Sequence, residues 1–463
     1  MEKISFKKAG TYYLIGNLFN KGIAFLTIPV FTRILSKSEY GIVNTYNSWI
    51  SILTIVMGFA IYMGIRAAFV DYKEEIDDFM SVSTTFTLLC GAVITVMVGG
   101  VALFLPLNIS VSVVFLCLMQ GVAAALLQNY SMYLMMKYSY KLRTMFMILP
   151  NLISVVISIL VILFVLKSNL YMGRIVPTAC VTIGFALITV VMVYRKSRKL
   201  FNKKMLKYAL AISAPLVLHG IALTLLSQSD RMMITWLADS AQTGIYSLIY
   251  NFSMIATVIT TSLDGIWVPW FTDKLKNRET QAINTKVVGY INLMTYAMIG
   301  IILIGPEVVK LLASKGYWEG ISIIPPIVLS NFIIFAYTLY VNIEHFHKKT
   351  LVITINTLIA AGANLILNLI FIPLFGYVAA AYTTLVSYII SFALHAIRAK
   401  KLEKELYTLK TFAPSLIHLT LATVVFYVCM DMWYIRIPVL VIYIILMFYK
   451  NRDLIKNVLR RKS

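Results

Sequence analysis

The chain has 463 residues, of which 60% are hydrophobic and 13% charged, and its net charge is +22. This apolar fraction exceeds the roughly 45 to 50% of soluble domains, so it excludes an ordinary soluble protein and predicts a chain that lies in a lipid bilayer. A positive charge can also indicate nucleic-acid binding, but here the basic residues stand in short connectors between apolar runs, and we expect no nucleic-acid partner.

Apolar runs bounded by charged residues, Pro or Gly predict about fourteen transmembrane helices, since about 20 apolar residues cross a bilayer as a helix. None of the runs shows the alternation of membrane β-strands, so we expect an all-α, polytopic membrane protein. In chain order the expected spans are residues 10–35, 41–65, 80–105, 111–136, 145–166, 171–194, 208–237, 243–267, 287–312, 320–343, 350–372, 377–397, 412–432 and 435–448.

The connectors differ sharply in their Lys and Arg content. With a cytoplasmic N-terminus, 32 of the 41 basic residues fall in cytoplasmic segments and 7 in external ones. Because short cationic loops are translocated poorly, this bias predicts that both termini lie in the cytoplasm and that the number of helices is even. The remaining two, Lys21 and Arg231, lie inside predicted spans.

The densest basic connector, residues 194–207, predicts a boundary between two lobes of six helices each. Similar segments follow the first and seventh helices: each has a basic residue (Arg33, Arg231), a Leu, a polar turn, and then Gly-Ile at Gly41 or Gly244. A parallel repeat of this kind predicts a substrate cavity between the lobes. We expect lobes at residues 1–200 and 201–400, with two appended helices and a basic tail at residues 401–463.

Enzyme signatures are missing from the sequence. The four cysteines lie inside apolar runs without a CxxC spacing, and the chain has no phosphate-binding loop and no connector long enough for a catalytic domain. We therefore expect a protein that is not an enzyme and has no cofactor.

Permanent cations in or beside the spans predict a site for an anionic group. A charge at the centre of a membrane helix costs about 2.5–3.5 kcal/mol on insertion scales, so it usually faces a cavity, and Lys and Arg suit a diphosphate. We expect this cationic cavity to contain Lys21, Arg33, Arg66 and Arg231. Lys21, Arg33 and Arg66 have a simpler alternative, in which their long side chains reach the lipid headgroups.

Further polar groups in the spans are candidates for the cavity wall or for ion coupling: Asn17, Asn20, His219 and Asp230. Pro29 and Pro215 interrupt the first and seventh helices and predict kinks used in gating, although a static kink used for packing is an equal alternative.

Four segments together resemble one known family. They are Ile28-Pro-Val-Phe-Thr-Arg-Ile-Leu-Ser-Lys-Ser-Glu-Tyr-Gly41, Ser229-Asp-Arg231 with Gly244-Ile-Tyr246, Trp267-Val-Pro-Trp270, and the run from Asn364 to Thr384. Their order and spacing are similar to the polysaccharide flippase family of the multidrug/oligosaccharidyl-lipid/polysaccharide exporter superfamily. The resemblance covers nearly the whole chain.

The resemblance implies an alternating-access transporter in the bacterial cytoplasmic (inner) membrane. It would move undecaprenyl-diphosphate-linked repeat units of O-antigen or capsule to the outer leaflet, and its partners would be that lipid-linked oligosaccharide, membrane lipids and other polysaccharide assembly proteins. Related flippases use ion gradients, so coupling to sodium or protons is expected. The matching sodium-site positions are Asp230, Asn364, Asn368, Thr384 and the Ala380 carbonyl. The carboxylate expected near Asn368 is missing, so at most a weak sodium site is implied.

Three other functions stay open. A multidrug exporter of the same superfamily would favour an acidic cavity, against which the membrane-embedded basic residues argue. A peptidoglycan-precursor flippase fits the same fold. A membrane polysaccharide polymerase would need a long external loop. The longest external connectors between the predicted spans have only about ten residues.

Overall fold

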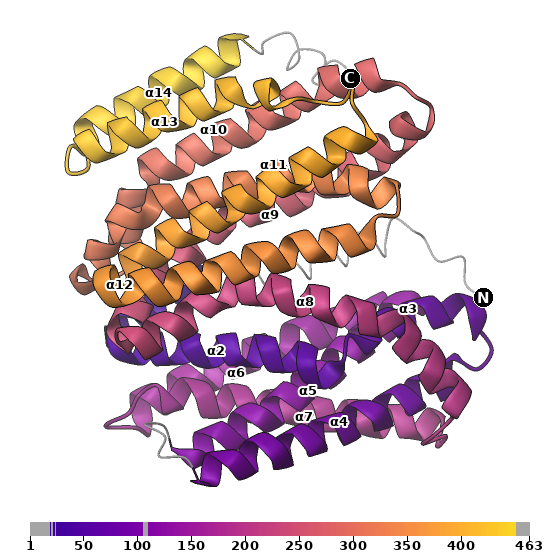
Figure 1. Cartoon of the computed structure of the whole chain (residues 1–463). Coiled ribbons are helices and arrows are strands. Elements are labelled where there is room, and N and C mark those ends of the chain that lie inside the picture. The colour runs from indigo at the N-terminus through magenta and orange to yellow at the C-terminus, as the bar shows by residue number, and fades with distance from the viewer. Residues whose placement is uncertain (1–18, 20–21, 24, 105–109, 451–463) are drawn as a thin grey trace. The chain divides into compact units, whose positions relative to one another are not determined.

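A computed structural model describes residues 19, 22–23, 25–104 and 110–450, and the described part contains helices and no strand (Figure 1). The α-helices are α2 (Lys37–Gly58), α3 (Ile61–Asp71), α4 (Ile76–Phe104), α5 (Val111–Met136), α6 (Tyr140–Phe164), α7 (Met172–Lys196), α8 (Lys203–Leu237), α9 (Ser240–Lys276), α10 (Thr280–Leu312), α11 (Ile324–Phe346), α12 (Thr350–Leu402), α13 (Ala413–Val428) and α14 (Trp433–Lys450). The short 3-10 helices are η1 (Lys315–Ile323) and η2 (Leu409–Thr411).

The described helices have the length and apolarity of membrane spans. Within the described residues, nine helices are long and apolar enough to cross a bilayer, or ten if the bent pair α2–α3 is one span. Three shorter apolar helices, Phe25–Ile34, Ala413–Val428 and Trp433–Met447, fall at other predicted spans. The all-α membrane fold is therefore confirmed, and every predicted span after the first is helical over most of its described length.

Helix α12 contains two of the predicted spans in one element. Its backbone leaves the helical region at Gly376, where φ is 60° and ψ is −144°. Such a conformation is open to glycine because it has no Cβ. The predicted break between residues 372 and 377 thus corresponds to a sharp turn at this glycine.

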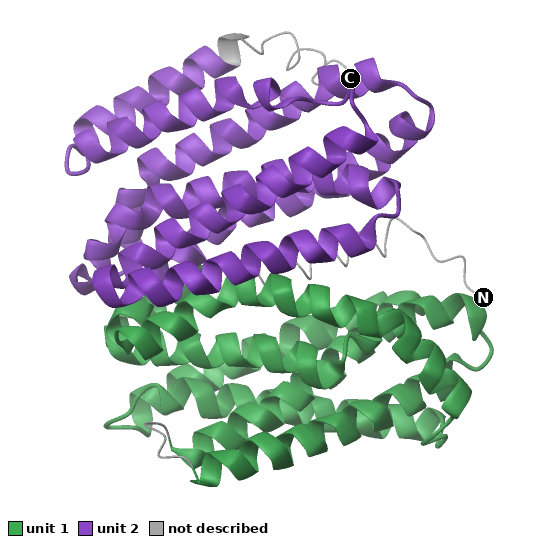
Figure 2. Cartoon of the chain, in the orientation of Figure 1, with its two compact units in different colours: residues 1–244 green, residues 245–463 purple. Residues whose placement is uncertain are grey.

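The chain forms two compact units, residues 1–244 (unit 1) and 245–463 (unit 2), shown in green and purple in Figure 2. Unit 1 contains α2 to α8, in which α5 packs on α2, α4 and α7, and α8 packs on α2 and α3. In unit 2, α10 packs on α11, α13 and α14, and α11 packs on α12. The division into six-helix lobes at residue 200 with two appended helices stays a prediction.

The second predicted span, residues 41–65, is not the continuous helix that the sequence suggested. It is broken between α2 and α3, which are bent by 42°, and Phe59 and Ala60 both have left-handed backbone conformations with φ of 49° and 48°. Non-glycine residues adopt this region at a cost, so neighbours must hold the break in place. One such neighbour is Ser213 of α8, whose hydroxyl donates to the Ala60 carbonyl at 3.1 Å.

The start of α2 explains why the polar turn after the first helix precedes a new helix. Ser36 and Glu39 form a capping box: the Ser36 Oγ accepts from the Glu39 amide at 3.2 Å, and Glu39 Oε2 accepts from the Ser36 amide at 3.0 Å. This arrangement satisfies amide groups that have no partner within the helix.

The first turns of α2 and α9 touch through the two glycines of the sequence repeat. A Cβ on Gly41 would lie 1.7 Å from the Ser240 carbonyl oxygen, and one on Gly244 would lie 2.1 Å from the Lys37 carbonyl oxygen. Beside them the hydroxyls of Ser38 and Ser240 are 2.5 Å apart. The repeated Gly-Ile segments therefore meet backbone to backbone in unit 1.

Candidate functional site

The candidate site in unit 1 is the buried polar interface between α2 and α8. Arg231, which is only 4% exposed, lies on α8 with its Nη1 2.7 Å from Gln228 Oε1 and 3.5 Å from the Ser227 carbonyl. Across the interface, the Ser48 hydroxyl of α2 donates to the same Gln228 Oε1 at 3.2 Å. The amide oxygen of Gln228 thus joins the guanidinium to the neighbouring helix.

A ladder of threonine hydroxyls continues from this interface toward the start of α9. Thr45 Oγ1 lies 2.6 Å from Thr235 Oγ1, which lies 2.7 Å from Thr243 Oγ1. Thr45 and Thr243 both donate to the Arg231 carbonyl at 3.4 Å. Hydroxyls can both donate and accept, so the ladder satisfies polar groups inside an apolar helix contact.

Asp230, the neighbour of Arg231 in the sequence, is 1% exposed, and both groups of this pair are therefore shielded from solvent. An ionised side chain at this depth is costly unless other groups compensate it. The polar residues Ser48, Gln228 and the threonines were not expected to take part. Uncharged polar side chains are frequent in membrane helices, and only their helical register toward Arg231 could have indicated them.

The other predicted cavity residues have different settings. Arg33 and Arg66 are exposed, His219 and Pro29 are partly buried, and Pro215 is exposed on α8. Lys21, Asn17 and Asn20 lie outside the described residues. Within unit 1, the structure therefore buries both Asp230 and Arg231 and places Arg231 in the polar interface, and the membership of the other cations in a common site stays a prediction.

Arg174 of α7, at the predicted external end of the sixth span, is a further cation near the first helix. Its guanidinium carbon lies 4.5 Å from the centroid of the Phe31 ring, and its Nη1 lies 3.4 Å from Ser158 Oγ of α6. A guanidinium over an aromatic face is a favourable contact. Arg174 therefore belongs among the cations that a transport experiment should include.

A second polar network lies in α12 of unit 2 and contains the predicted coupling residues. Asn364 Nδ2 donates to Thr384 Oγ1 at 3.2 Å, and Asn368 Nδ2 donates to Asn364 Oδ1 at 3.2 Å. Thr383, which was not predicted, donates to Asn368 Oδ1 and to the Ala380 carbonyl. All of these side chains are buried, so the two halves of α12 are joined by hydrogen bonds across the turn at Gly376.

This network fits a sodium ion poorly. Its side chains are neutral, and the two asparagine oxygens already accept hydrogen bonds from within the network. Hard cations prefer several oxygen ligands that include carboxylates. Among the described residues, no group of three or more His, Cys, Asp or Glu could hold a metal ion. Asp230 belongs to unit 1 and the asparagines to unit 2, so a weak sodium site that includes both stays a prediction.

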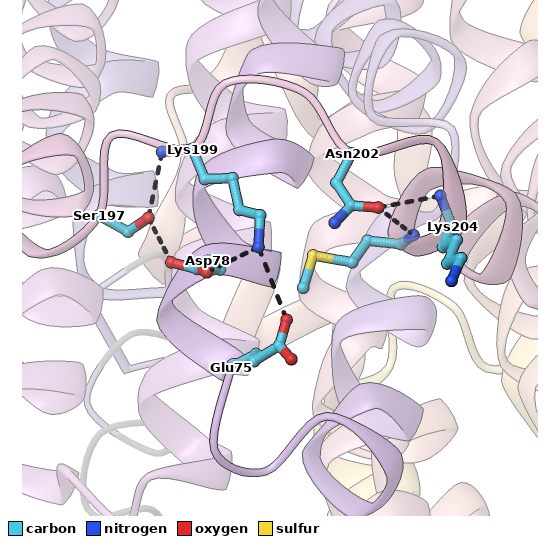
Figure 3. A network of polar contacts seen from close by, with 7 residues as sticks. Glu75, Asp78, Ser197, Lys199, Asn202 and Lys204 are labelled. Carbon is cyan, nitrogen blue, oxygen red and sulfur yellow. Dashed lines mark hydrogen bonds and ion pairs between the residues drawn. The ribbon is translucent and has the colours of Figure 1, made fainter.

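An ion network fixes the connector between α7 and α8, at the predicted cytoplasmic end of unit 1 (Figure 3). Lys199 Nζ lies 3.1 Å from Asp78 Oδ2 and 3.7 Å from Glu75 Oε2, and the Ser197 hydroxyl donates to Asp78 Oδ1 at 2.6 Å. Asn202 then caps α8, because its Oδ1 accepts from the amides that begin the helix. The basic connector is thus tied to the first turn of α4.

The hydrogen bond to Asp78 raises the pKa of Lys199, and the nearby Glu75 acts in the same direction. A raised lysine pKa means that the ion pair is formed at neutral pH and is lost only as the pH rises through the lysine titration. The Lys199 side chain is partly exposed, so the ion pair positions the connector more than it stabilises the fold.

Comparison with known proteins relates the chain to a polysaccharide biosynthesis family. The sequence profile of the family described as "Polysaccharide biosynthesis protein" matches residues 6–274. An "Uncharacterized membrane protein" of Haemophilus influenzae is 22% identical over 377 residues, which cover 78% of this chain and 90% of that protein.

Two solved structures share the fold. The structure titled "Lipid II flippase MurJ, inward closed conformation" matches with a TM-score of 0.70 at 18% identity, over 96% of this chain and 99% of that one. An inward-facing multidrug resistance MATE family transporter of the MOP superfamily matches with a TM-score of 0.60 at 14% identity, over 86% and 99% of the two chains.

Proposed function

Because this chain belongs to the polysaccharide biosynthesis protein family, we propose that it is a flippase for lipid-linked oligosaccharides used in building a bacterial surface polysaccharide. The substrate would be an undecaprenyl-diphosphate-linked repeat unit of O-antigen or capsule, moved from the inner to the outer leaflet of the cytoplasmic membrane. Transport would proceed by alternating access and would be driven by a sodium or proton gradient. The protein would not act as an enzyme.

The observation that carries the choice of substrate is the buried guanidinium of Arg231 within a membrane-spanning helix. Its charge is permanent, and its planar donors match a phosphate group. In the described state Arg231 Nη1 is bonded to Gln228, an exchangeable neutral partner. We propose that the diphosphate replaces this partner during transport, with Lys21, Arg33 and Arg66 as further cations, while the sugars stay in water.

The experiment is flipping of a fluorescent undecaprenyl-diphosphate oligosaccharide in liposomes that contain the purified protein. We expect Arg231→Gln to reduce the flipping rate at least about tenfold, since a charged hydrogen bond is worth about 1.5–3 kcal/mol. Arg231→Lys keeps the charge but loses the planar fork, so its rate should be intermediate. Lys21→Ala should also slow flipping if that residue contributes to the same site.

Arg278→Gln is the matched control, because its side chain is 81% exposed and makes only a 3.9 Å contact with Glu403. It should flip at the wild-type rate. Unchanged flipping by a folded variant with all four predicted cations replaced would contradict the diphosphate site. Flipping that requires nucleotide hydrolysis by the purified protein alone would contradict a gradient-driven mechanism.

A peptidoglycan-precursor flippase is the second candidate, favoured by the match to a structure titled as a lipid II flippase over 96% of this chain. The same liposome assay with lipid II as substrate decides between the two. Faster flipping of lipid II than of several O-antigen or capsule units would favour this alternative. Efflux of a cationic dye without any lipid flipping would instead indicate a multidrug exporter, and elongation of the glycan a polymerase.

A further inference from the structure

A buried acid–base pair joins α11 and α12 in unit 2. Glu344 Oε2 lies 2.7 Å from His395 Nδ1, and both side chains are fully buried. The imidazole stacks on the Tyr337 ring, with centroids 5.5 Å apart and an angle of 17° between the planes, and Asn356 Nδ2 lies 3.5 Å from the same Nδ1. The ring is therefore held in one orientation by groups from both helices.

The second oxygen of the Glu344 carboxylate and the second nitrogen of the His395 ring have no hydrogen-bond partner among the described residues. Both Glu344 Oε1 and His395 Nε2 are buried and unpaired. Buried polar atoms are bonded in the large majority of cases, and the exceptions call for an explanation. A carboxylate oxygen and an imidazole nitrogen share one chemical ability, since each can accept a proton.

The negative charge of the Glu344 carboxylate favours proton binding by the pair. A carboxylate beside a neutral imidazole leaves one negative charge in an apolar interior, where an uncompensated charge is unfavourable. One proton on the imidazole converts this arrangement into a neutral ion pair. Arg398 is the nearest permanent cation along α12, one turn from His395, and the described contacts give it no ion pair with Glu344. The other titratable groups around the pair are Tyr250 of α9, Tyr337 and His345 of α11, and Tyr388 of α12.

A second His–Glu pair, which is more exposed, lies at the end of the contact between α11 and α12 that faces water. His347 Nε2 lies 2.8 Å from Glu403 Oε1, just beyond the ends of α11 and α12, with side chains 29% and 11% exposed. Glu344 stands one turn before His347, so the buried pair lies directly inward from the exposed one. Water at this end of unit 2 can therefore supply or receive a proton.

We propose that Glu344 and His395 form a proton-binding site in unit 2. Uptake transfers one proton from hydronium to His395 Nε2, forming an N–H bond and leaving water, while the Nδ1–H···Oε2 hydrogen bond is kept. Release reverses the step, and no electron is transferred. Use of this proton to drive transport rests on the proposed flippase function, whereas proton binding itself does not.

The test is nuclear magnetic resonance of histidine-labelled protein in lipid nanodiscs, which needs no transport substrate. The chain has five histidines, so the His395 signal can be identified by its loss in His395→Gln. We expect its ring signals to change from charged to neutral imidazole in one step as the pH is raised. Glu344→Gln keeps an acceptor for Nδ1 but removes the negative charge, so it should weaken proton binding by His395 at least about tenfold.

His347→Gln is the matched control, because it breaks the exposed His–Glu pair and should leave the His395 titration unchanged. If His395→Gln does not fold, the signal is assigned instead by removing the other four histidines one at a time. A neutral His395 at every pH at which the protein stays folded, or a titration that Glu344→Gln does not alter, would show that the pair is only a fixed hydrogen bond and would overturn the proposal.

Discussion

At the residue scale, two glycines allow a close backbone contact between helices that any larger side chain would block. Gly41 and Gly244 stand at matching places in the sequence repeat, and in unit 1 they let α2 and α9 touch through their backbones. Membrane helices associate largely through such close packing, because lipid and apolar side chains are equally nonpolar. The hydroxyl pair of Ser38 and Ser240 adds a polar contact at the same place.

We expect Gly41→Ala to lower the unfolding free energy of the purified protein by about 1–3 kcal/mol, because the new methyl group would overlap the Ser240 carbonyl. Gly184→Ala is the control: no described atom lies within 4 Å of the methyl group that it would add in α7. This control should be neutral or stabilise the helix by up to about 1 kcal/mol. Thermal unfolding in detergent measures both, and equal melting temperatures would refute the close contact.

At the scale of elements, one arginine connects the last two helices to α10 within unit 2. Arg436 of α14 is completely buried and contacts Glu307 of α10 through both terminal nitrogens, at 3.0 and 2.5 Å. It also donates to the carbonyls of Leu303 in α10 and Cys429 at the end of α13. A planar cation with five donors can thus bind two helices and a turn at once.

Replacing this cation should loosen α13 and α14 from α10. We expect Arg436→Leu to destabilise unit 2 by about 3 kcal/mol, because Glu307 and two carbonyls would lose their partner. The buried Cys429 reports the change, since its thiol should react faster with a maleimide when the helices detach. Arg278→Leu removes an exposed Arg–Glu contact and should change stability by less than about 1 kcal/mol. Unaltered labelling of Cys429 in Arg436→Leu would contradict this role.

At the scale of the whole molecule, the distribution of basic residues predicts the orientation in the membrane. The connectors that carry most of the Lys and Arg should face the cytoplasm, together with both termini. The alternation of helices then assigns every connector to one side. This assignment also determines that the buried Glu344–His395 pair lies toward the cytoplasmic end of unit 2.

Single cysteines in a cysteine-free background test this orientation in intact cells with a membrane-impermeant maleimide. Ser168→Cys and Ser314→Cys should be labelled from outside, because they lie in connectors predicted to be external. Asn277→Cys and Lys349→Cys should react only after the cells are permeabilised. All four positions are exposed, so differences in burial do not explain the pattern. The opposite labelling would place both termini outside.

The sequence by itself determined the helical membrane fold, most span positions and the family. These depend on apolar runs of about 20 residues, on turn residues such as Gly376, and on motifs in order along the chain, all of which are local in the sequence. The capping box at Ser36 and Glu39 is local in the same way.

Only the tertiary structure decided which distant side chains meet. The break at Phe59 and Ala60 puts two non-glycine residues in the left-handed region, and a hydroxyl from α8 stabilises it. Arg436, at the predicted external end of the last span, is buried because Glu307 and two carbonyls compensate its charge. Likewise Glu344 and His395 are 51 residues apart, and no motif in the sequence links them. The energy of a buried charge depends on its partners, and partners across a helix interface leave no pattern in a single sequence.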